Sequence, residues 1–373
     1  MKAQLALKAL GEIMQWDDSR AQTEFQWLRL MARLKYDAYE DFRAGARFIE
    51  SLVTWLQQFD QEDREPMYEI VRRRIIYFGG EELQRLVDLF YPRTLEKRLV
   101  KNICKKFNIP PFRFWVHAEA VKEFRKQLRK TLIMALSDGA RIDQLRRATY
   151  GLLVNDQFVG MTQVDEDKWD ELLKELRKDL GDPSARFSHV VLVDDFMGTG
   201  STILRNESGE WKGRLPRFRK TLNNIAGLEE KAFEPEWTLQ VHHYLALPRS
   251  NKQTEDRARK ARTELGEENW FPNIDFTYEL GIPDEFSLAK DSRFVGLSKK
   301  YYNSSVETDS TRKSGFDNMS LGYGECGLPV VIGHNTPNNS VPLLWYECDA
   351  RVVKGVQEPE MRPLFRRRQR HIT

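Results

Sequence analysis

The sequence predicts an α/β fold in which a domain built on a parallel sheet follows an all-helical N-terminal domain. Short apolar segments of strand length, at 131–136, 190–193 and 237–245, alternate with helical segments. This order is typical of a parallel sheet. Before residue 110, by contrast, apolar residues recur every three or four positions, which is the period of a helix.

The length of 373 residues allows two domains, and 40% hydrophobic with 31% charged residues is typical of a globular protein. Pro110-Pro111 marks a boundary, because proline ends helices and stiffens linkers. The expected domains are therefore a helical docking or regulatory domain at 1–110, an α/β domain at 111–350 and a basic tail at 351–373.

Helical spacing is clearest in two segments of the N-terminal part. One stripe consists of Phe42, Gly45, Ile49, Leu52, Leu56 and Phe59, and the next of Met67, Ile70, Val71 and Ile75. Later, Leu328–Ile332 is expected to be a last short strand, and 251–265 a surface helix because it lacks a firm apolar stripe.

Composition excludes several classes of protein. No segment approaches the 18 apolar residues of a membrane span, and the N-terminus does not read as a signal peptide. Cys104, Cys326 and Cys348 are odd in number and far apart, which indicates reduced thiols in a cytoplasmic protein. The net charge of +3 does not by itself indicate nucleic acid. The basic end, Arg366–His371, either binds an acidic partner or nucleic-acid phosphates, or is a loose terminus.

One segment combines the features of a sugar-phosphate site. Val190–Val193 is continuous and β-branched, as expected of a buried parallel strand, and Asp194 and Asp195 follow it directly. In the Gly/Thr/Ser-rich turn that follows, small residues let backbone N–H groups approach a phosphate, and we expect a helix after the turn whose N-terminus favours the same anion. The acids suit sugar hydroxyls, or a magnesium ion bound to the ligand. Together these features predict a pocket for a ribose 5′-phosphate.

The segment resembles the signature of type I phosphoribosyltransferases, in which four hydrophobic residues and two acids precede Thr-Gly-x-Thr. The matching residues are Asp194, Asp195, Thr199, Gly200 and Thr202. The resemblance implies a Rossmann-like parallel sheet. It also implies that the two acids hold the ribose 2′ and 3′ hydroxyls, with Mg²⁺ reaching them only through the ligand. The residues implied to bind the ribose and 5′-phosphate of phosphoribosyl pyrophosphate are Gly198, Thr199, Gly200, Ser201 and Thr202. The plainer alternative is an unrelated acidic strand end with a glycine turn.

A second loop supports this interpretation. It consists of Ser137, Asp138, Gly139, Ala140 and Arg141, and it follows the strand 131–136. The resemblance implies a pyrophosphate-binding loop at this place. Gly139 permits close backbone approach, and Arg141 can pair with pyrophosphate oxygens as a catalytic group. The alternative is an ordinary turn with a surface arginine.

A third polar loop follows the strand at 328–332. Its candidate base or acceptor contacts are His334, Asn335, Asn338 and Asn339. Asparagine side chains can read a nucleobase edge, and histidine can transfer a proton. The alternative is a structural loop, because Asn, Thr and Pro favour turns.

Over residues 115–350 the combination of these three segments resembles the phosphoribosyltransferase-like proteins of bacterial conflict systems. The resemblance implies a toxic effector of an anti-phage defence system, with transfer chemistry at ribose C1. It implies partner proteins such as a retron reverse transcriptase or a sensor, with nucleic acid reached through them. The alternatives are a module that binds a ribose-phosphate nucleotide without turnover, and a structural subunit of a nucleoprotein complex.

Overall fold

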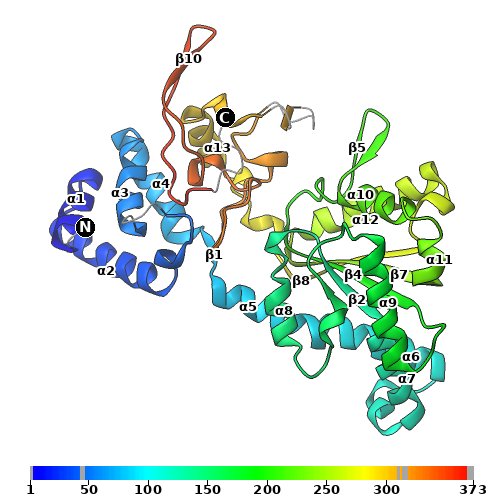
Figure 1. The fold of residues 1–373 in the computed structure, drawn as a ribbon. Helices are drawn as coiled ribbons and strands as arrows, with labels where there is room; N and C mark the ends of the chain where they lie inside the picture. Colours follow the sequence, from blue (N-terminus) through cyan, green and yellow to red (C-terminus); the bar gives the residue numbers. More distant parts are fainter. Residues whose placement is uncertain (1–2, 43–46, 309–310, 313–317, 368–373) are drawn as a thin grey trace. The chain divides into compact units, whose positions relative to one another are not determined.

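The computed structural model describes residues 3–42, 47–308, 311–312 and 318–367 (Figure 1). It divides the chain into two compact units, of which the second is Gln84–Ile282. The first unit combines Met1–Leu83 with Pro283–Thr373, so both ends of the chain contribute to one core.

This division differs from the domains expected from the sequence. Pro110-Pro111 does not separate the units, because the short helix η3 (Pro111–Val116) lies inside the second unit. Residues 283–350 belong with the N-terminal helices instead of the α/β domain. Tertiary contacts between residues far apart in the sequence cause this difference. For example, the indole Nε1 of Trp55 donates to the carbonyl oxygen of Leu343 at 2.6 Å.

The N-terminal part of the first unit is helical, as predicted, with one short strand. Its elements are α1 (Ala3–Met14), α2 (Asp18–Leu34), α3 (Phe48–Gln57), α4 (Gln61–Arg73) and β1 (Ile76–Phe78). Helix α3 covers only part of the stripe expected from Phe42 to Phe59, and Gly45 lies outside the described residues. Helix α5 (Gly80–Leu89) then spans the boundary between the units.

The C-terminal part of the first unit contributes α13 (Ser292–Lys300), β9 (Val330–Ile332), β10 (Arg351–Val353) and β11 (Val356–Glu358). Strand β9 was expected in the main sheet. It pairs in parallel with β1 instead, and the two form a separate small sheet of the first unit. A strand of three residues carries too little pattern to specify its partner, so only the fold can assign it.

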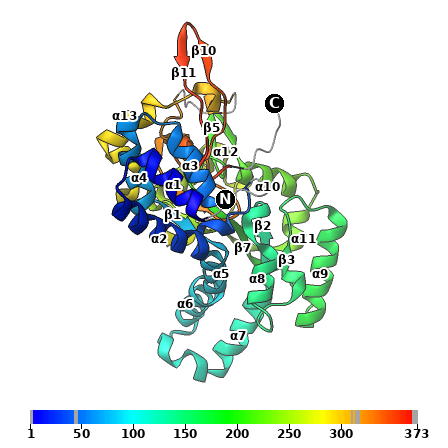
Figure 2. The ribbon, with the colours of Figure 1, turned by 90° about the vertical axis from the view of Figure 1, so that its left-hand side faces the viewer.

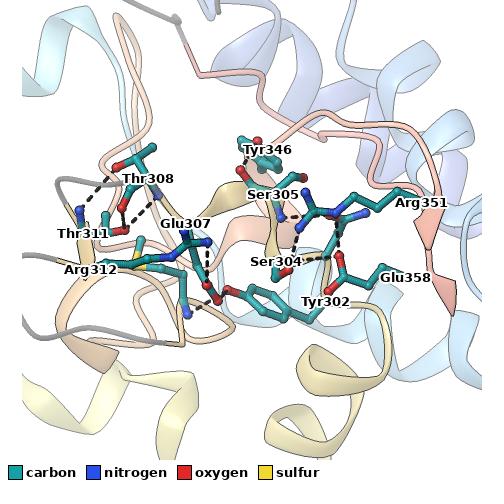
Figure 3. Close-up of polar contacts among 12 residues, drawn as sticks. Tyr302, Ser304, Ser305, Glu307, Thr308, Thr311, Arg312, Tyr346, Arg351 and Glu358 are labelled. Carbon is teal, nitrogen blue, oxygen red and sulfur yellow. Dashed lines mark hydrogen bonds and ion pairs between the residues drawn. The ribbon is translucent and has the colours of Figure 1, made fainter. Parts of the chain in front are cut away.

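The segment expected to be a basic tail begins as ordered structure. Strands β10 and β11 form an antiparallel hairpin. Figure 3 shows how polar contacts attach it to the preceding chain: the Arg351 guanidinium donates to Glu358 at 2.7 Å and to Ser304 Oγ at 2.5 Å. The Tyr346 hydroxyl donates to the carbonyl oxygen of Ser305 at 2.6 Å.

The end of this segment is also packed. Leu364 and Phe365 are fully buried in the core of the first unit. Arg366 pairs with Glu347 at 3.1 Å, and the Arg367 guanidinium lies 5.2 Å from the centre of the Trp345 ring. The rest of the predicted basic end, residues 368–371, lies outside the described residues.

The second unit is an α/β domain around a five-stranded sheet, which confirms the predicted fold class (Figure 1). The strands lie in the order β3-β2-β4-β7-β8, and all neighbours are parallel. These strands are β2 (Thr131–Ala135), β3 (Phe158–Val159), β4 (Phe187–Met197), β7 (Phe233–Ala246) and β8 (Asn273–Gly281). The small hairpin of β5 (Arg205–Glu207) and β6 (Glu210–Lys212) stands apart from this sheet.

Helices surround the sheet. They are η2 (Phe90–Glu96, a π-helix), α6 (Lys97–Phe107), α7 (Ala118–Arg129), α8 (Ile142–Ala148), α9 (Glu166–Leu180), α10 (Arg214–Asn223), α11 (Leu228–Ala232) and α12 (Pro248–Leu265). Apolar residues of α9, α10 and α12 share one core with one face of the sheet.

On the other face of the sheet, β2 and β4 are mostly apolar, but β7 and β8 carry polar side chains that are buried or half-buried. Gln240 of β7 donates to Thr277 Oγ1 of β8 at 2.9 Å. Arg98 of α6 pairs with Asp275 of β8 at 2.5 Å. Helix α6 is therefore held to the sheet by charge as well as by packing, because a buried polar group must find a partner.

Candidate active site at the ends of strands β2 and β4

Two of the three predicted loops meet at one edge of the sheet. Strands β2 and β4 are parallel neighbours, with Ala135 opposite Val193, and the backbone N–H of Leu136 donates to the carbonyl oxygen of Val193 at 2.9 Å. The segment Ser137–Arg141 leaves β2 at the edge where the acid pair of β4 lies. In open parallel sheets this carboxyl edge is the usual place for a ligand.

The acids and the second loop are in direct contact. Asp194 is only 7% exposed, and its Oδ1 accepts hydrogen bonds from the Ser137 hydroxyl and from the backbone N–H of Asp195, the latter at 3.1 Å. Asp195 Oδ1 accepts from the backbone N–H of Phe196 at 2.7 Å. A Cβ at Gly139 would lie 2.5 Å from Asp195 Oδ2, so this close approach requires glycine.

The acid pair has an unusual titration. Burial, and then the charge of Asp195, raise the pKa of Asp194 to about 7, while the Ser137 hydrogen bond and the Arg214 charge act in the opposite direction. Burial also lowers the pKa of the neighbouring His243 to about 4. The site therefore holds a neutral imidazole beside an Asp194 carboxyl group whose raised pKa keeps its proton up to near neutral pH.

Arg214 is a site residue that the sequence did not reveal. Its charge acts on both Asp194 and His243. Its Nε is buried and has no hydrogen-bond partner among the described residues. An arginine at the start of α10, outside any motif, gives no local signal.

A side chain of strand β7 holds the Ser137–Arg141 loop in place. The hydroxyl of Tyr244, which is fully buried, donates to the carbonyl oxygen of Ala140 at 3.1 Å. Arg141 has a left-handed backbone with φ of 50°, and its Nη1 donates to Gln144 Oε1 at 3.0 Å. Asp138 begins the short helical turn η4 (Asp138–Ala140). These contacts give the Ser137–Arg141 loop a defined conformation.

The predicted phosphate loop, 198–202, forms turns. Thr199 Oγ1 and Ser201 Oγ are 2.9 Å apart, and Gly200 has φ of +72°. The expected helix does not follow directly: β5 and β6 intervene, and α10 begins only at Arg214. Its first backbone N–H nevertheless donates to the Thr202 carbonyl oxygen at 3.0 Å.

Arg257 of α12 anchors this loop. Its Nη2 donates to the Thr199 carbonyl oxygen at 2.6 Å, and its Nη1 donates to the Leu204 carbonyl oxygen at 2.7 Å. A Cβ at Gly200 would collide with Thr254 of the same helix. Helix α12, expected at the surface, is confirmed as a helix but has a buried face of small and polar residues: Ser250, Asn251, Thr254, Ala258 and Ala261.

We expect Arg257→Ala to loosen the loop between Thr199 and Leu204. Two charged hydrogen bonds to carbonyl oxygens are lost, each of which contributes about 1.5–3 kcal/mol. Amide hydrogen exchange of residues 198–204, measured by mass spectrometry, should accelerate at least about tenfold. Arg259→Ala is the control, because Arg259 lies on the same helix with a 70% exposed side chain. Unchanged exchange in Arg257→Ala would show that the loop keeps its shape without this anchor.

Comparison with known proteins identifies the family. The family described as PRTase-CE matches residues 52–367, which is most of the chain. The chain belongs to the PRTase-CE family. It therefore has a phosphoribosyltransferase-like domain. Membership of this family supports an activity of the transferase kind. No curated protein and no solved structure gives a significant match.

The PRTase-CE match extends through the third predicted loop, which belongs to the first unit. There Asn339 is 6% exposed, and its Nδ2 donates to the Tyr323 carbonyl oxygen at 2.9 Å. The backbone of Asn338 accepts from the Tyr323 N–H at 2.8 Å, and the Asn335 N–H donates to the Ile332 carbonyl oxygen at 2.9 Å. These contacts stabilise the loop itself. A role of His334 in the chemistry stays a prediction.

Asp194 and Asp195 are two adjacent carboxyl groups, which would meet Mg²⁺ only together with the phosphates of a bound ligand. Mg²⁺ usually takes one or two carboxylates and completes its shell with water and substrate phosphates. Among the described residues, no group of three or more His, Cys, Asp or Glu side chains could hold an ion by itself.

Within those same ranges, no helix has the length and apolarity of a membrane span.

Proposed function

We propose that the site at the ends of β2 and β4 binds phosphoribosyl pyrophosphate, or a related ribose-phosphate nucleotide, and transfers its ribosyl group at C1. The observation that carries the proposal is the contact between the acid pair and the Ser137–Arg141 loop, made across neighbouring strands. The PRTase-CE relationship supports the same class of ligand.

The proposed roles follow the chemistry of each group. Asp194 and Asp195 accept hydrogen bonds from the ribose hydroxyls, and the 198–202 loop donates backbone N–H groups to the 5′-phosphate. Arg141 and the N–H groups of its loop receive the pyrophosphate.

In the proposed reaction the bond between C1 and the pyrophosphate oxygen breaks, and a nucleophile bonds to C1. The electron pair of the broken bond leaves with pyrophosphate. Mg²⁺ on the pyrophosphate would supply charge stabilisation for this leaving group. The chain's own contribution is to orient the ribose through the acid pair and to stabilise developing charge through Arg141 and the loop amides.

As a second candidate, the site binds the ligand without turning it over. The close packing of Gly139 on Asp195 brings the second loop against the acids, and this contact supports ligand binding with or without turnover. For either candidate we propose the cellular role that the sequence resemblance implies. That role is an effector in anti-phage defence, held in check by a reverse transcriptase or a sensor partner.

Calorimetry with phosphoribosyl pyrophosphate and Mg²⁺ tests the proposal. The wild-type chain should bind, and Asp195→Asn should weaken binding at least about tenfold, because a hydrogen bond to a charged group is lost. Asp167→Asn is the control, because Asp167 is an exposed acid of the same unit. No binding by the wild-type chain, or equal binding by all three proteins, would contradict the proposed ligand. Release of pyrophosphate, followed by ion-exchange chromatography, separates turnover from binding alone.

A further inference from the structure

A helical hairpin of the second unit carries a concentration of positive charge that the candidate site does not use. The hairpin consists of α6, η3 and α7, and the two helices lie side by side in Figures 1 and 2. Residues 97–130 contain eleven Lys and Arg but only two Glu. The whole chain has a net charge of only +3, so the rest of the sequence is net negative. The positive charge is therefore concentrated on this hairpin.

Three of these cations hold the base of the hairpin in place. Arg98 pairs with Asp275, Arg129 with Asp179 at 2.7 Å and Lys130 with Glu234 at 2.6 Å. A further pair links Lys106 with Glu123 across the two helices. These four cations have structural roles in ion pairs, which leaves the other seven Lys and Arg of the hairpin to be considered.

The other cations are exposed, and their side chains have no hydrogen bond or ion pair with any described residue. They are Lys97, Lys101, Lys105, Arg113, Lys122, Arg125 and Lys126. On α6, Lys97, Lys101 and Lys105 follow each other at four-residue spacing, so they form a row on one helix face with a rise of about 6 Å between neighbours. Such a row fits a linear polyanion whose charges recur along its length.

The tip of the hairpin adds aromatic surface to this charge. Phe112 is 86% exposed and Trp115 is 57% exposed, although most large aromatic side chains of the chain are buried. The Trp115 ring packs edge-on against Phe124 with ring centres 5.5 Å apart, so its orientation is held while more than half of the residue stays exposed. Aromatic faces beside cations are the usual platform for unpaired bases.

A surface hollow joins the two features. It has a volume of about 410 Å³ and is lined by Trp115, Val116, Ala118, Val121, Lys122 and Arg125. An indole and two cations in one hollow can receive a base and the adjoining phosphate together. We propose that the α6–η3–α7 hairpin binds single-stranded nucleic acid, with Trp115 and Phe112 stacking on bases and the α6 and α7 cations contacting phosphates.

Two observations favour this occupant over a membrane. The apolar residues of α6 and α7, including Leu99, Ile103 and Phe124, are buried. The exposed apolar surface is confined to the short tip η3, so no long amphipathic helix face is left to lie in a bilayer interface. The cations also extend along α6 and α7 and are not gathered at the tip alone. Unpaired bases are favoured over a duplex, because stacking on Trp115 requires an open base face.

The test uses the full chain and fluorescence anisotropy with a labelled single-stranded RNA and with DNA of the same sequence. The wild-type chain should bind at least one of them. Lys101→Glu with Lys105→Glu should lower the salt dependence of log K by about 1.4, as expected for two lost phosphate contacts on a single strand. Phe112→Ala and Trp115→Ala should each weaken binding roughly tenfold or more.

The control variant carries Lys174→Glu and Lys252→Glu, which change the same charge at exposed positions elsewhere in the second unit. If this control loses binding equally, the hairpin is not the binding surface and the proposal is wrong. If all variants bind as the wild type does, the proposal is also overturned. Co-sedimentation with phosphatidylserine vesicles that depends on Phe112, without oligonucleotide binding, would replace it with a membrane contact. Phe112→Ala guards against misfolding, because so exposed a side chain contributes little to the core.

Discussion

Asp194→Asn should stabilise the folded chain at pH 8 and weaken ligand binding in the same protein. The raised pKa means that the folded carboxyl keeps its proton up to about pH 7, whereas an unfolded aspartate loses it near pH 4. Stability is therefore lost as the pH rises between these values, and asparagine, which does not ionise, avoids the loss. Asn can still accept the hydrogen bonds from Ser137 and the Asp195 N–H.

Urea unfolding at several pH values measures this effect. The gain in unfolding free energy should reach at most about 4 kcal/mol at pH 8 and shrink toward zero near pH 4. Affinity for phosphoribosyl pyrophosphate should fall about tenfold to a hundredfold, because the charged acceptor is gone. Asp167→Asn should change neither quantity. A gain that is independent of pH, or a loss of stability at pH 8, would contradict the raised pKa of Asp194.

Gly139→Ala should disrupt the contact between the second loop and the acid pair. The new Cβ would lie 2.5 Å from Asp195 Oδ2, and Asp195 cannot easily move because its other oxygen accepts the Phe196 N–H. Overpacking of this kind typically costs about 1–3 kcal/mol. We expect ligand affinity to fall at least about tenfold, measured by calorimetry. Gly160→Ala is a matched control, because a Cβ there meets nothing within 4 Å. Equal affinity in both variants would remove the Ser137–Arg141 loop from the site.

The elements with strong patterns were predictable from the sequence. The apolar runs at 131–136 and 190–193 are β2 and part of β4, and the α/β fold with its helical N-terminal region is confirmed. Strand β8 was missed although Ile274, Phe276, Tyr278 and Leu280 alternate with polar residues. Its polar side is only partly exposed, because Thr277 accepts a hydrogen bond from Gln240 and Asp275 pairs with Arg98.

The site was predictable only as far as its motifs extend. The acid pair and the second loop could be placed together because the carboxyl ends of parallel neighbours meet at one edge. Arg214 and Arg257 could not be found, because neither belongs to a motif and only the folded chain brings their guanidinium groups to the site. The third loop belongs to the first unit because of the β1–β9 pairing, whose three-residue strands give no signal in sequence.

The first unit is formed by residues 1–83 together with residues 283–373. This arrangement implies an order of folding during synthesis. Residues 84–282 are continuous, so the second unit can fold as soon as it leaves the ribosome. Helices α1–α4, although made first, must wait for Leu343, Leu364 and Phe365 before their core is closed. A chain that stops early would carry a finished second unit beside exposed apolar helices, which chaperones and proteases recognise. The core of the first unit is therefore completed only after residues 343–365 have been made.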